Sequence, residues 1–427
     1  MTLPVDLTPD TKYQLLLHIS REISGTLDLD EVLNQLIDAL KSAIPYDAAG
    51  IFVLNENSLA PRGRIGSHMI EGMATRGFPE RPQEDDPMLK SGKGIIGYVI
   101  RTGKKVIARD VRRHPNYIEG REGTLSEIAV PIIVNGQVIG ALNLESDRVN
   151  AFSEADAELL QFISNSAAIA IEKAMLHQHL LESKRIESQL KIARQVQAGL
   201  LPAQPPSLAG YDISAINLPN SEIGGDYFDY IPLPHGKLGI AIADVSGKGV
   251  PAALIMATFR AALRTRVRLD SSISRVMQSV NTFLLESVGS SDFVTAVFGA
   301  LDPRSGRFAY SNCGHNPPLI LRGGGSTVEL QEGGLVLGVD GDARYNASTV
   351  TLDPGDVLVL YTDGVVEVPD PGGKEFGLKG LERTIRGAWN LSATDMIQSV
   401  VRSTESLIGS AGYDDDFTLM VVKRMEK

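Results

Sequence analysis

The sequence places an aspartate beside an apolar run in four separate segments. Residues 238–243 are apolar and lead directly into an aspartate, after which a glycine-rich turn and a proline open a predicted helix. A carboxylate at the end of a strand is held by a rigid element, where a site can use it. The four aspartates that we expect to meet in this way are Asp226, Asp244, Asp363 and Asp415.

Converging carboxylates repel one another unless a cation compensates their charge. Ligands that are all oxygen favour Mg²⁺ or Mn²⁺ over zinc. Two such ions can share a carboxylate, lower the pKa of a water between them and bind a phosphoryl oxygen. The pattern therefore predicts hydrolysis of a phosphate ester by metal-activated water, with no nucleophilic side chain.

Each acid also has a structural interpretation. Asp363 with Gly364 is a common turn pair, Asp244 can cap a helix, and residues 414–416 can form a solvated acidic turn. Four acids beside apolar strands in one domain favour the metal site. Two other functions stay open: a non-catalytic sensor with a structural ion, and a metal-dependent nucleotide phosphodiesterase.

Composition limits the class of protein. The 427 residues carry 41 Lys and Arg against 52 Asp and Glu, a net charge of −11 that argues against a nucleic-acid partner. The single cysteine, Cys313, excludes an internal disulfide and a cysteine metal cluster. We find no signal peptide and no apolar run of about 18 residues, so we expect a cytoplasmic protein that does not enter a membrane.

The first 170 residues alternate helical and strand patterns. Helices are expected after Asp10, with Leu15, Leu16, Ile19 and Ile23 on one face, and after Asp28. Strands are expected at residues 48–54 and 105–108, and a hairpin at Asn135-Gly136. Residues 61–86 show a poor pattern, which predicts a long loop or a segment that faces a ligand. Ser153 is expected to be the N-cap of a long final helix.

This part resembles a GAF domain, through residues 93–99, the hairpin at 128–144 and the helix entry at 151–156. The resemblance covers about residues 15–172 and implies an antiparallel sheet with helices. Residues 15–172 contain no cysteine that could attach a bilin, and the sequence pattern of cyclic-nucleotide-binding GAF domains is not evident. His68 and His114 are candidate contacts for an unknown small ligand, although a lone loop histidine is more often solvated. A dimerisation domain without a ligand is an equal alternative.

Residues 171–201 predict a helical linker, because they are charged and almost free of glycine and proline. A heptad frame places Leu176 and Leu190 on one seam position and Ile186, Ala193 and Leu200 on the other. His179, Ser183 and Gln197 interrupt these positions, so we expect a marginal parallel homodimer helix whose register can shift. Three prolines, at 202, 205 and 206, mark the boundary to a third region, residues 202–427.

In that third region, runs of strands surround a central pair of helices, which predicts an antiparallel sandwich with helices outside, an α+β domain. The expected strands are residues 211–216, 226–230, 238–243, 293–301, 308–312, 318–321, 349–352, 357–361 and 418–422. The expected helices are residues 250–266, 273–287, 378–389 and 394–407.

From about residue 193 to residue 423 the chain resembles the SpoIIE-type branch of the PPM (type 2C) metal-dependent Ser/Thr phosphatases. The motifs that carry the resemblance are Gln197-Ala198-Gly199-Leu200-Leu201-Pro202, Gly224-Gly225-Asp226-Tyr227-Phe228-Asp229, Asp244-Val245-Ser246-Gly247-Lys248-Gly249, Gly314-His315-Asn316-Pro317-Pro318, Tyr361-Thr362-Asp363-Gly364 and Asp415-Asp416-Phe417-Thr418.

The resemblance implies a role for each acid. Asp244 is similar to the acid that bridges two ions, with the backbone carbonyl of Val245 as a further ligand. Asp226 is similar to the ligand of the second ion, and Asp363 and Asp415 to ligands of the first. Asp416 and Asp229 are similar to acids that bind through water.

The chain departs from the eukaryotic pattern at two points. Ser246 stands where those enzymes have a proposed acid histidine, and no N-terminal phosphate-binding arginine is evident. His315 is a candidate acid, but its Gly-His-Asn-Pro turn favours a structural loop.

The resemblance also implies partners and regulation. The substrate would be a phosphoserine or phosphothreonine on a small STAS-type anti-sigma-factor antagonist. The GAF domain would sense a signal, and residues 195–202 would act as a switch that completes the metal site.

Overall fold

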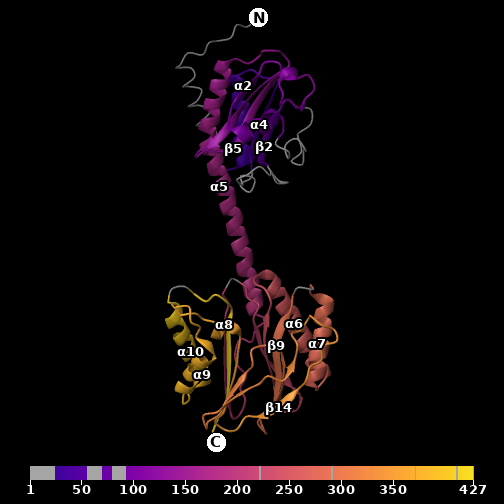
Figure 1. Cartoon of the computed structure of the whole chain (residues 1–427), viewed down its shortest axis with the longest axis vertical. Coiled ribbons are helices and arrows are strands. Elements are labelled where there is room, and N and C mark those ends of the chain that lie inside the picture. Colours follow the sequence, from indigo (N-terminus) through magenta and orange to yellow (C-terminus); the bar gives the residue numbers. More distant parts are fainter. Residues whose placement is uncertain are drawn as a thin grey trace. The chain divides into compact units, whose positions relative to one another are not determined.

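A computed structural model of the chain describes residues 25–54, 70–78, 93–220, 223–289, 292–370, 372–409 and 412–426. The chain forms two compact units, Met1–Ile186 and Glu187–Lys427 (Figure 1). Both units combine antiparallel sheets with helices, which confirms the α+β class. The helix expected around Leu15 and Ile23 and the loop residue His68 lie outside the described residues.

The first unit is built on one antiparallel sheet with the order β2-β1-β5-β4-β3. Its strands are β1 (Ala48–Leu54), β2 (Ile70–Arg76), β3 (Val106–Ala108), β4 (Ser126–Val134) and β5 (Gln137–Ser146). Asn135 and Gly136 connect β4 to β5 with φ values of 50° and 82°. Two consecutive positive φ angles are the geometry that an Asn-Gly hairpin requires, and this prediction is confirmed.

Strand β2 corrects the prediction of one long loop over residues 61–86. It pairs with β1 along its whole length, from Ile70 to Arg76. The sequence Ile-Glu-Gly-Met-Ala-Thr-Arg carries little apolar alternation. An edge strand pairs on one side only, so backbone pairing with the buried β1 sets its conformation more than its own side chains do.

Helices cover both faces of this sheet. On one face α2 (Leu29–Ala43) and the first part of α5 (Glu154–Ala198) enclose the main core. Asp28 caps α2 by accepting a hydrogen bond from the Glu31 N–H at 2.9 Å. Ser153 caps α5 as predicted, since its Oγ accepts from the Asp156 N–H at 3.2 Å. On the other face lie α4 (Gly94–Thr102) and the short helix η2 (Val111–Arg113).

Helix α5 is 45 residues long and includes the predicted linker. Its buried side chains end at Met175, and beyond that point its large apolar side chains are exposed. No described helix combines the length and the apolar character needed to span a bilayer.

The second unit is a sandwich of two sheets. The first sheet has the order β13-β10-β9-β8-β7 with β14 paired to β10, and the second has the order β12-β11-β15-β16-β6. The strands of the first sheet are β7 (Tyr227–Leu233), β8 (Lys237–Val245), β9 (Val294–Leu301), β10 (Arg307–Cys313), β13 (Gly333–Gly334) and β14 (Ser348–Thr351). Those of the second are β6 (Tyr211–Leu218), β11 (Leu319–Leu321), β12 (Thr327–Glu329), β15 (Val357–Tyr361) and β16 (Phe417–Arg424).

Helices pack outside both sheets, which gives four layers (Figure 1). Helices α6 (Val250–Leu269) and α7 (Ile273–Ser287) cover the first sheet. Helices α9 (Gly377–Gly387) and α10 (Ala393–Ile408) cover the second, and the one-turn helix α8 (Asp363–Val366) follows β15. A buried cluster that includes Ile242, Leu360 and Met420 fills the space between the sheets. The predicted sandwich with outer helices is confirmed.

Candidate metal centre and active site

Asp244 lies near the end of β8, between β7 and β9. The following turn has positive φ angles at Gly247 (88°) and Gly249 (74°), and α6 begins directly after it. The hydroxyl of Ser246 accepts a hydrogen bond from the Phe293 N–H at 2.8 Å, and its own N–H donates to the Phe293 carbonyl at 3.0 Å. Ser246 therefore holds the turn against the neighbouring chain segment.

Asp226 immediately precedes β7 and is buried. Its Oδ2 accepts hydrogen bonds from the hydroxyls of Thr362 at 2.8 Å and Thr418 at 2.5 Å. Both threonines belong to the second sheet region, so Asp226 joins the two sheets at one end of the sandwich. These threonines were not among the residues predicted from the sequence, although each stands inside a motif beside a predicted metal-binding acid.

Asp416 is buried and fixes the loop in front of β7. Its Oδ2 accepts from the Gly225 N–H at 2.7 Å, and its Oδ1 from the Asn220 N–H at 2.9 Å. A Cβ atom on Gly224 would collide with the Asp416 carboxylate, so only glycine fits at that position.

The predicted acids influence one another electrostatically, which shows that the fold brings them together. Burial, followed by the charges of Asp363, Asp415 and Asp416, raises the pKa of Asp244 to about 7. Burial and then Asp244 raise the pKa of Asp226 well above its ordinary value. Burial and the charge of Asp415 raise the pKa of Asp363. The carboxylates thus form one cluster of like charges.

Lys248 partly compensates this cluster. Its Nζ lies 3.0 Å from Asp415 Oδ2 and donates to the Asp414 carbonyl oxygen at 2.9 Å. The hydrogen bond with Asp415 raises the pKa of Lys248. A pocket of about 20 Å³, lined among others by Asp244, Lys248 and Asp415, opens at this point, which is room for about one water or ion.

The donor set fits hard divalent cations, because it consists of carboxylates and backbone carbonyls whose mutual repulsion a cation relieves. Among the described residues, however, no three His, Cys, Asp or Glu side chains already surround one common point. In this conformation the acids are gathered, but they are not yet arranged as a complete coordination shell.

Asp229 corrects one hypothesis of the sequence analysis. Arg264 of α6 donates to both of its carboxylate oxygens, at 2.6 and 2.7 Å, and the Tyr227 hydroxyl donates to Oδ2. Tyr227 packs in the apolar layer between the first sheet and α6. Asp229 is therefore half of a buried ion pair in that layer, and the hypothesis that it binds metal through water is wrong.

His315 is fully buried in its turn, as the structural interpretation expected. Its Nδ1 lies 2.8 Å from the Thr295 hydroxyl, and the Asn312 side chain bonds both its N–H and its carbonyl. Burial lowers the pKa of His315 to about 4, so the ring is neutral near pH 7.

His114, the described candidate in the first unit, follows η2. Its Nδ1 accepts from the Asn116 N–H at 3.4 Å, and burial lowers its pKa. In the described part of the chain it belongs to no group of three His, Cys, Asp or Glu side chains that could hold a metal ion.

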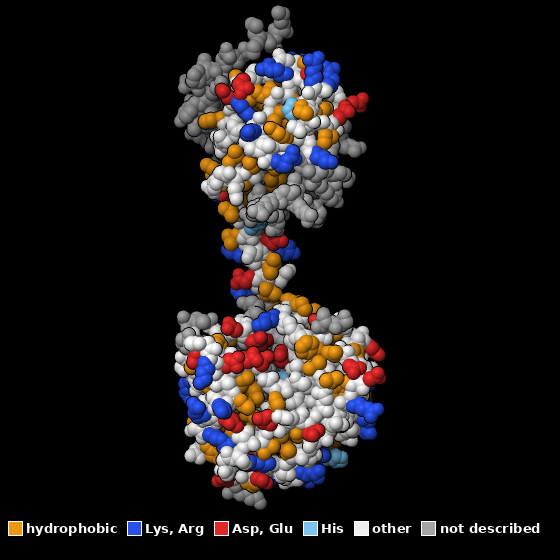
Figure 2. Space-filling view, viewed as in Figure 1, with side chains coloured by type: hydrophobic (Ala, Val, Ile, Leu, Met, Phe, Trp, Pro, Cys, Tyr) orange, Lys and Arg blue, Asp and Glu red, His pale blue; other side chains and the backbone are white. Residues whose placement is uncertain are grey.

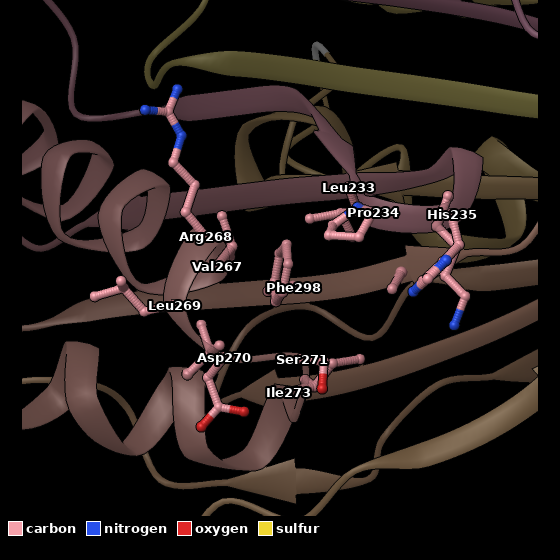
Figure 3. Close-up of a pocket in the computed structure, with 13 residues that line it drawn as sticks. Leu233, Pro234, His235, Val267, Arg268, Leu269, Asp270, Ser271, Ile273 and Phe298 are labelled. Carbon is pink, nitrogen blue, oxygen red and sulfur yellow. The ribbon is translucent and has the colours of Figure 1, made fainter.

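A larger pocket, of about 340 Å³, lies elsewhere in the second unit (Figure 3). It is lined by the turn between β7 and β8 and by the connection from α6 to α7, including Leu233, Val267 and Phe298. Lys237 at this pocket and Asp244 are seven residues apart on the same strand, a distance of roughly 23 Å. In Figure 3 the Arg268 side chain points away from Leu233 and Phe298. The pocket is thus separate from the acids.

Comparison with known proteins agrees with this geometry. Residues 234–425 match the family described as Stage II sporulation protein E (SpoIIE), and residues 26–172 match the GAF domain. The phosphoserine phosphatase RsbU of Bacillus subtilis is 32% identical over 244 residues, which cover 56% of this chain and 71% of RsbU. The chain belongs to the SpoIIE-type PPM protein serine/threonine phosphatases.

Two further relatives of this SpoIIE-type phosphatase differ in how much they share with it. The phosphoserine phosphatase RsbP of Bacillus subtilis is 28% identical over 195 residues, which cover 44% of this chain and about half, 47%, of RsbP. The SiaA-PP2C domain of Pseudomonas aeruginosa has a TM-score of 0.51 at 21% identity, over 57% of this chain and 99% of that domain. This second likeness supports the fold alone.

Proposed function

We propose that this phosphatase removes phosphate from a phosphoserine or phosphothreonine on a small STAS-type anti-sigma-factor antagonist and requires two Mn²⁺ or Mg²⁺ ions. The observation that carries the proposal is the cluster of Asp226, Asp244, Asp363 and Asp415, drawn from both sheets, in which burial and neighbouring carboxylates raise the pKa values of Asp226, Asp244 and Asp363. RsbU and RsbP, which share its SpoIIE-type region, are named phosphoserine phosphatases.

In this proposal Asp244 would be shared by both ions, with the Val245 carbonyl as a further ligand. Asp226 would hold the second ion, and Asp363 and Asp415 the first. Asp416 contributes less directly, because backbone N–H groups already occupy both of its oxygens. When bound, the ions supply an activated water and neutralise charge on the phosphoryl oxygens.

The chain's own groups prepare the site for that chemistry. The hydroxyls of Thr362 and Thr418 hold Asp226 in one orientation and favour its ionised form. The ammonium group of Lys248 lies on Asp415, at the edge where an anionic phosphate approaches. Ser246 is tied to Phe293 and keeps the glycine-rich turn in place.

We also propose that the GAF domain and α5 control the site. The side chain of Gln197, near the end of α5, donates to the Gly224 carbonyl at 2.6 Å and accepts from the Gly224 N–H at 3.2 Å. Gly224 stands two residues before Asp226. A shift of the helix end would therefore move the loop that carries a metal ligand, which supports the switch role expected for residues 195–202.

A homodimer through α5 is part of this proposal. Large apolar side chains are exposed along the first-unit part of the helix at Phe162, Ile169, Leu176 and Leu180. Phe162, Ile169 and Leu176 recur every seven residues on the seam position of Leu176 and Leu190, and Leu180 lies beside that seam. Light scattering on full-length protein tests the dimer, which Leu176→Glu should convert to monomer.

Phosphate release tests the function. We expect Mn²⁺-dependent hydrolysis of p-nitrophenyl phosphate and of a phosphorylated STAS-domain protein, both abolished by EDTA. No release from either substrate with Mn²⁺ or Mg²⁺ present would overturn the proposal. Release from cyclic dinucleotides alone would favour the phosphodiesterase alternative. Binding of a partner with no turnover would favour the sensor with a structural ion.

A further inference from the structure

Two unlike surfaces border the candidate metal centre. One belongs to loops of the second sheet and is acidic, and the other belongs to loops of the first sheet and is apolar. Figure 2 shows acidic side chains gathered on the second unit with hydrophobic side chains beside them on the same face. Neither surface contributes a proposed metal ligand beyond those already named.

The acidic side extends outward from Asp363. Glu367 follows α8 directly, and its N–H donates to the Asp363 carbonyl at 2.9 Å. Burial and then the charges of Asp363, Glu375 and Asp415 raise the pKa of Glu367, so these charges lie near one another. A β-bridge between Pro369 and Glu375 brings the second glutamate back toward this segment. The exposed acids Glu367, Glu375 and Asp414 outnumber the exposed Lys248 and Lys374, which leaves surplus negative charge beside the ligands.

The apolar side follows two chain segments next to Asp244. Phe293 pairs through its backbone with Ser246, and the neighbouring Val294 forms a bridge with Leu337. On either side of Leu337, two aliphatic side chains are exposed: Leu335 by 58% and Val339 by 57%. Phe293 is itself exposed by 37%. We define these three residues, Phe293, Leu335 and Val339, as the apolar patch.

The patch is close enough to the acids to contact a bound substrate. Val245, next to Asp244, is paired with Val294, and Val294 is paired with Leu337. The backbones of Val245 and Leu337 are therefore about 10 Å apart, two strand spacings. A phosphoserine side chain extends only roughly 6 Å from its own backbone. A folded protein that presents its phosphoserine to Asp244 must therefore cover surface on both sides of the cluster.

We propose that this two-sided rim docks the folded phosphoprotein substrate and selects it over small phosphate esters. The occupant is a protein whose phosphoserine is bordered by an apolar surface on one side and by basic residues on the other. The basic residues would face Glu367 and Glu375, which are not proposed metal ligands and so keep their negative charge when the ions bind. The apolar surface of the substrate would cover Leu335 and Val339. This inference rests on the proposed function.

The test compares a folded phosphoprotein with p-nitrophenyl phosphate, which is too small to reach the rim while it occupies the acids. The variants are Leu335→Asp with Val339→Asp on the apolar side and Glu375→Lys on the acidic side. The matched control is Leu269→Asp, which changes a side chain that is 73% exposed at the separate pocket of Figure 3. The protein probe is a phosphorylated STAS-domain protein, and a short phosphopeptide cut from it serves as a third substrate.

We expect kcat/KM for the folded phosphoprotein to fall at least about tenfold in Leu335→Asp/Val339→Asp and several-fold in Glu375→Lys. Turnover of p-nitrophenyl phosphate and of the phosphopeptide should stay within about twofold, and Leu269→Asp should match wild type on all three substrates. The docking inference would be overturned if the variants lost activity on all three substrates together, or if they lost no activity on the folded phosphoprotein. Either result would leave the proposed function intact. A change of oligomeric state in the variants, with both substrates affected equally, would assign the patch to contact between copies. If the wild-type enzyme hydrolyses p-nitrophenyl phosphate but not the phosphoprotein, the proposed substrate is overturned as well.

Discussion

The amide of Gln197 forms two hydrogen bonds with the backbone of Gly224, one as donor and one as acceptor. A planar amide that engages both the N–H and the carbonyl of one residue fixes position and orientation together. A second contact lies nearby, where Arg260 of α6 donates to the Leu200 carbonyl at 2.7 Å. The end of α5 is thus attached to the loop before Asp226 and to the helix after Asp244.

Replacing Gln197 tests whether this attachment supports the site. Gln197→Leu removes both hydrogen bonds and keeps a helix-compatible side chain, so we expect the Mn²⁺ concentration for half-maximal activity to rise about tenfold. Two hydrogen bonds of about 1 kcal/mol each are enough for that change. Titration of p-nitrophenyl phosphate hydrolysis with Mn²⁺ measures it. Gln189→Ala, at an exposed position of the same helix outside residues 195–202, is the control, and equal behaviour of the two variants would contradict the prediction.

Asp244→Asn should have opposite effects on stability and on activity. Removing one charge from a repelling cluster is expected to raise the melting temperature of the metal-free protein. The same change removes the acid proposed to hold both ions, so activity should fall at least about a hundredfold. Calorimetry with and without Mn²⁺ completes the test, because ligand binding stabilises only protein that binds it. A variant that Mn²⁺ still stabilises as strongly as wild type would count against Asp244 as a ligand.

Lys248 should compete with the ions for Asp415. Its ammonium group must leave that carboxylate before a cation binds there, although the pair is half exposed and therefore weak. For Lys248→Met we expect the Mn²⁺ requirement to fall about two- to fivefold. An unchanged Mn²⁺ requirement with a raised KM would instead assign the lysine to the phosphate of the substrate.

The ion pair of Asp229 and Arg264 should affect stability and not metal affinity. Arg264→Met leaves a fully buried carboxylate without its cation. The cost should be about 3 kcal/mol of unfolding free energy, the low end for a buried pair, because a third of the arginine side chain is exposed. Urea unfolding followed by the single tryptophan, Trp389, measures this loss. Arg264→Met combined with Asp229→Asn should recover part of the stability, because no buried charge then remains. A shift in the Mn²⁺ requirement in either protein would contradict the assignment.

The first unit should lose stability as the pH rises. Burial, and then the charge of Glu145, raise the pKa of Glu127 to about 8 from its ordinary value of 4.5. Between pH 4.5 and about pH 8 the folded form therefore holds a proton that the unfolded form has already released. The stability that this proton contributes is complete below pH 4.5 and is lost progressively as the pH rises to about 8. The slope is at most about 1.4 kcal/mol per pH unit. Glu127→Gln should flatten it, as calorimetry of the full chain between pH 5 and pH 8 would show. An unchanged pH dependence would place the proton elsewhere.

The sequence predicted the acids well because each follows a strong local pattern. The apolar residues 238–243 and the glycines after Asp244 leave few alternatives to a strand, a tight turn and a helix. Strand β2 escaped prediction because its pairing with β1, and not its own composition, determines it. Asp229 was misassigned because resemblance to a family motif does not reveal that an arginine 35 residues later donates to this carboxylate.

Gln197 shows how one residue can be interpreted in two ways. In the heptad frame it is a polar interruption of an apolar seam. In the structure its side chain is half-buried near the end of the helix and contacts the loop at Gly224. Its polarity serves that contact, which lies far away in the sequence and which no helical periodicity can indicate. Thr362 and Thr418 were missed for the same reason, since their partner, Asp226, is more than 130 residues away.

The contact of Gly224 with the Asp416 carboxylate leaves no space for even one additional methyl group. Closely packed interfaces of this kind change between discrete arrangements and do not deform continuously. Individual enzyme molecules should therefore be either inactive or fully competent. A graded response of a population to its stimulus would then report how many molecules have changed state, and single-molecule turnover records should show two rates with nothing between them.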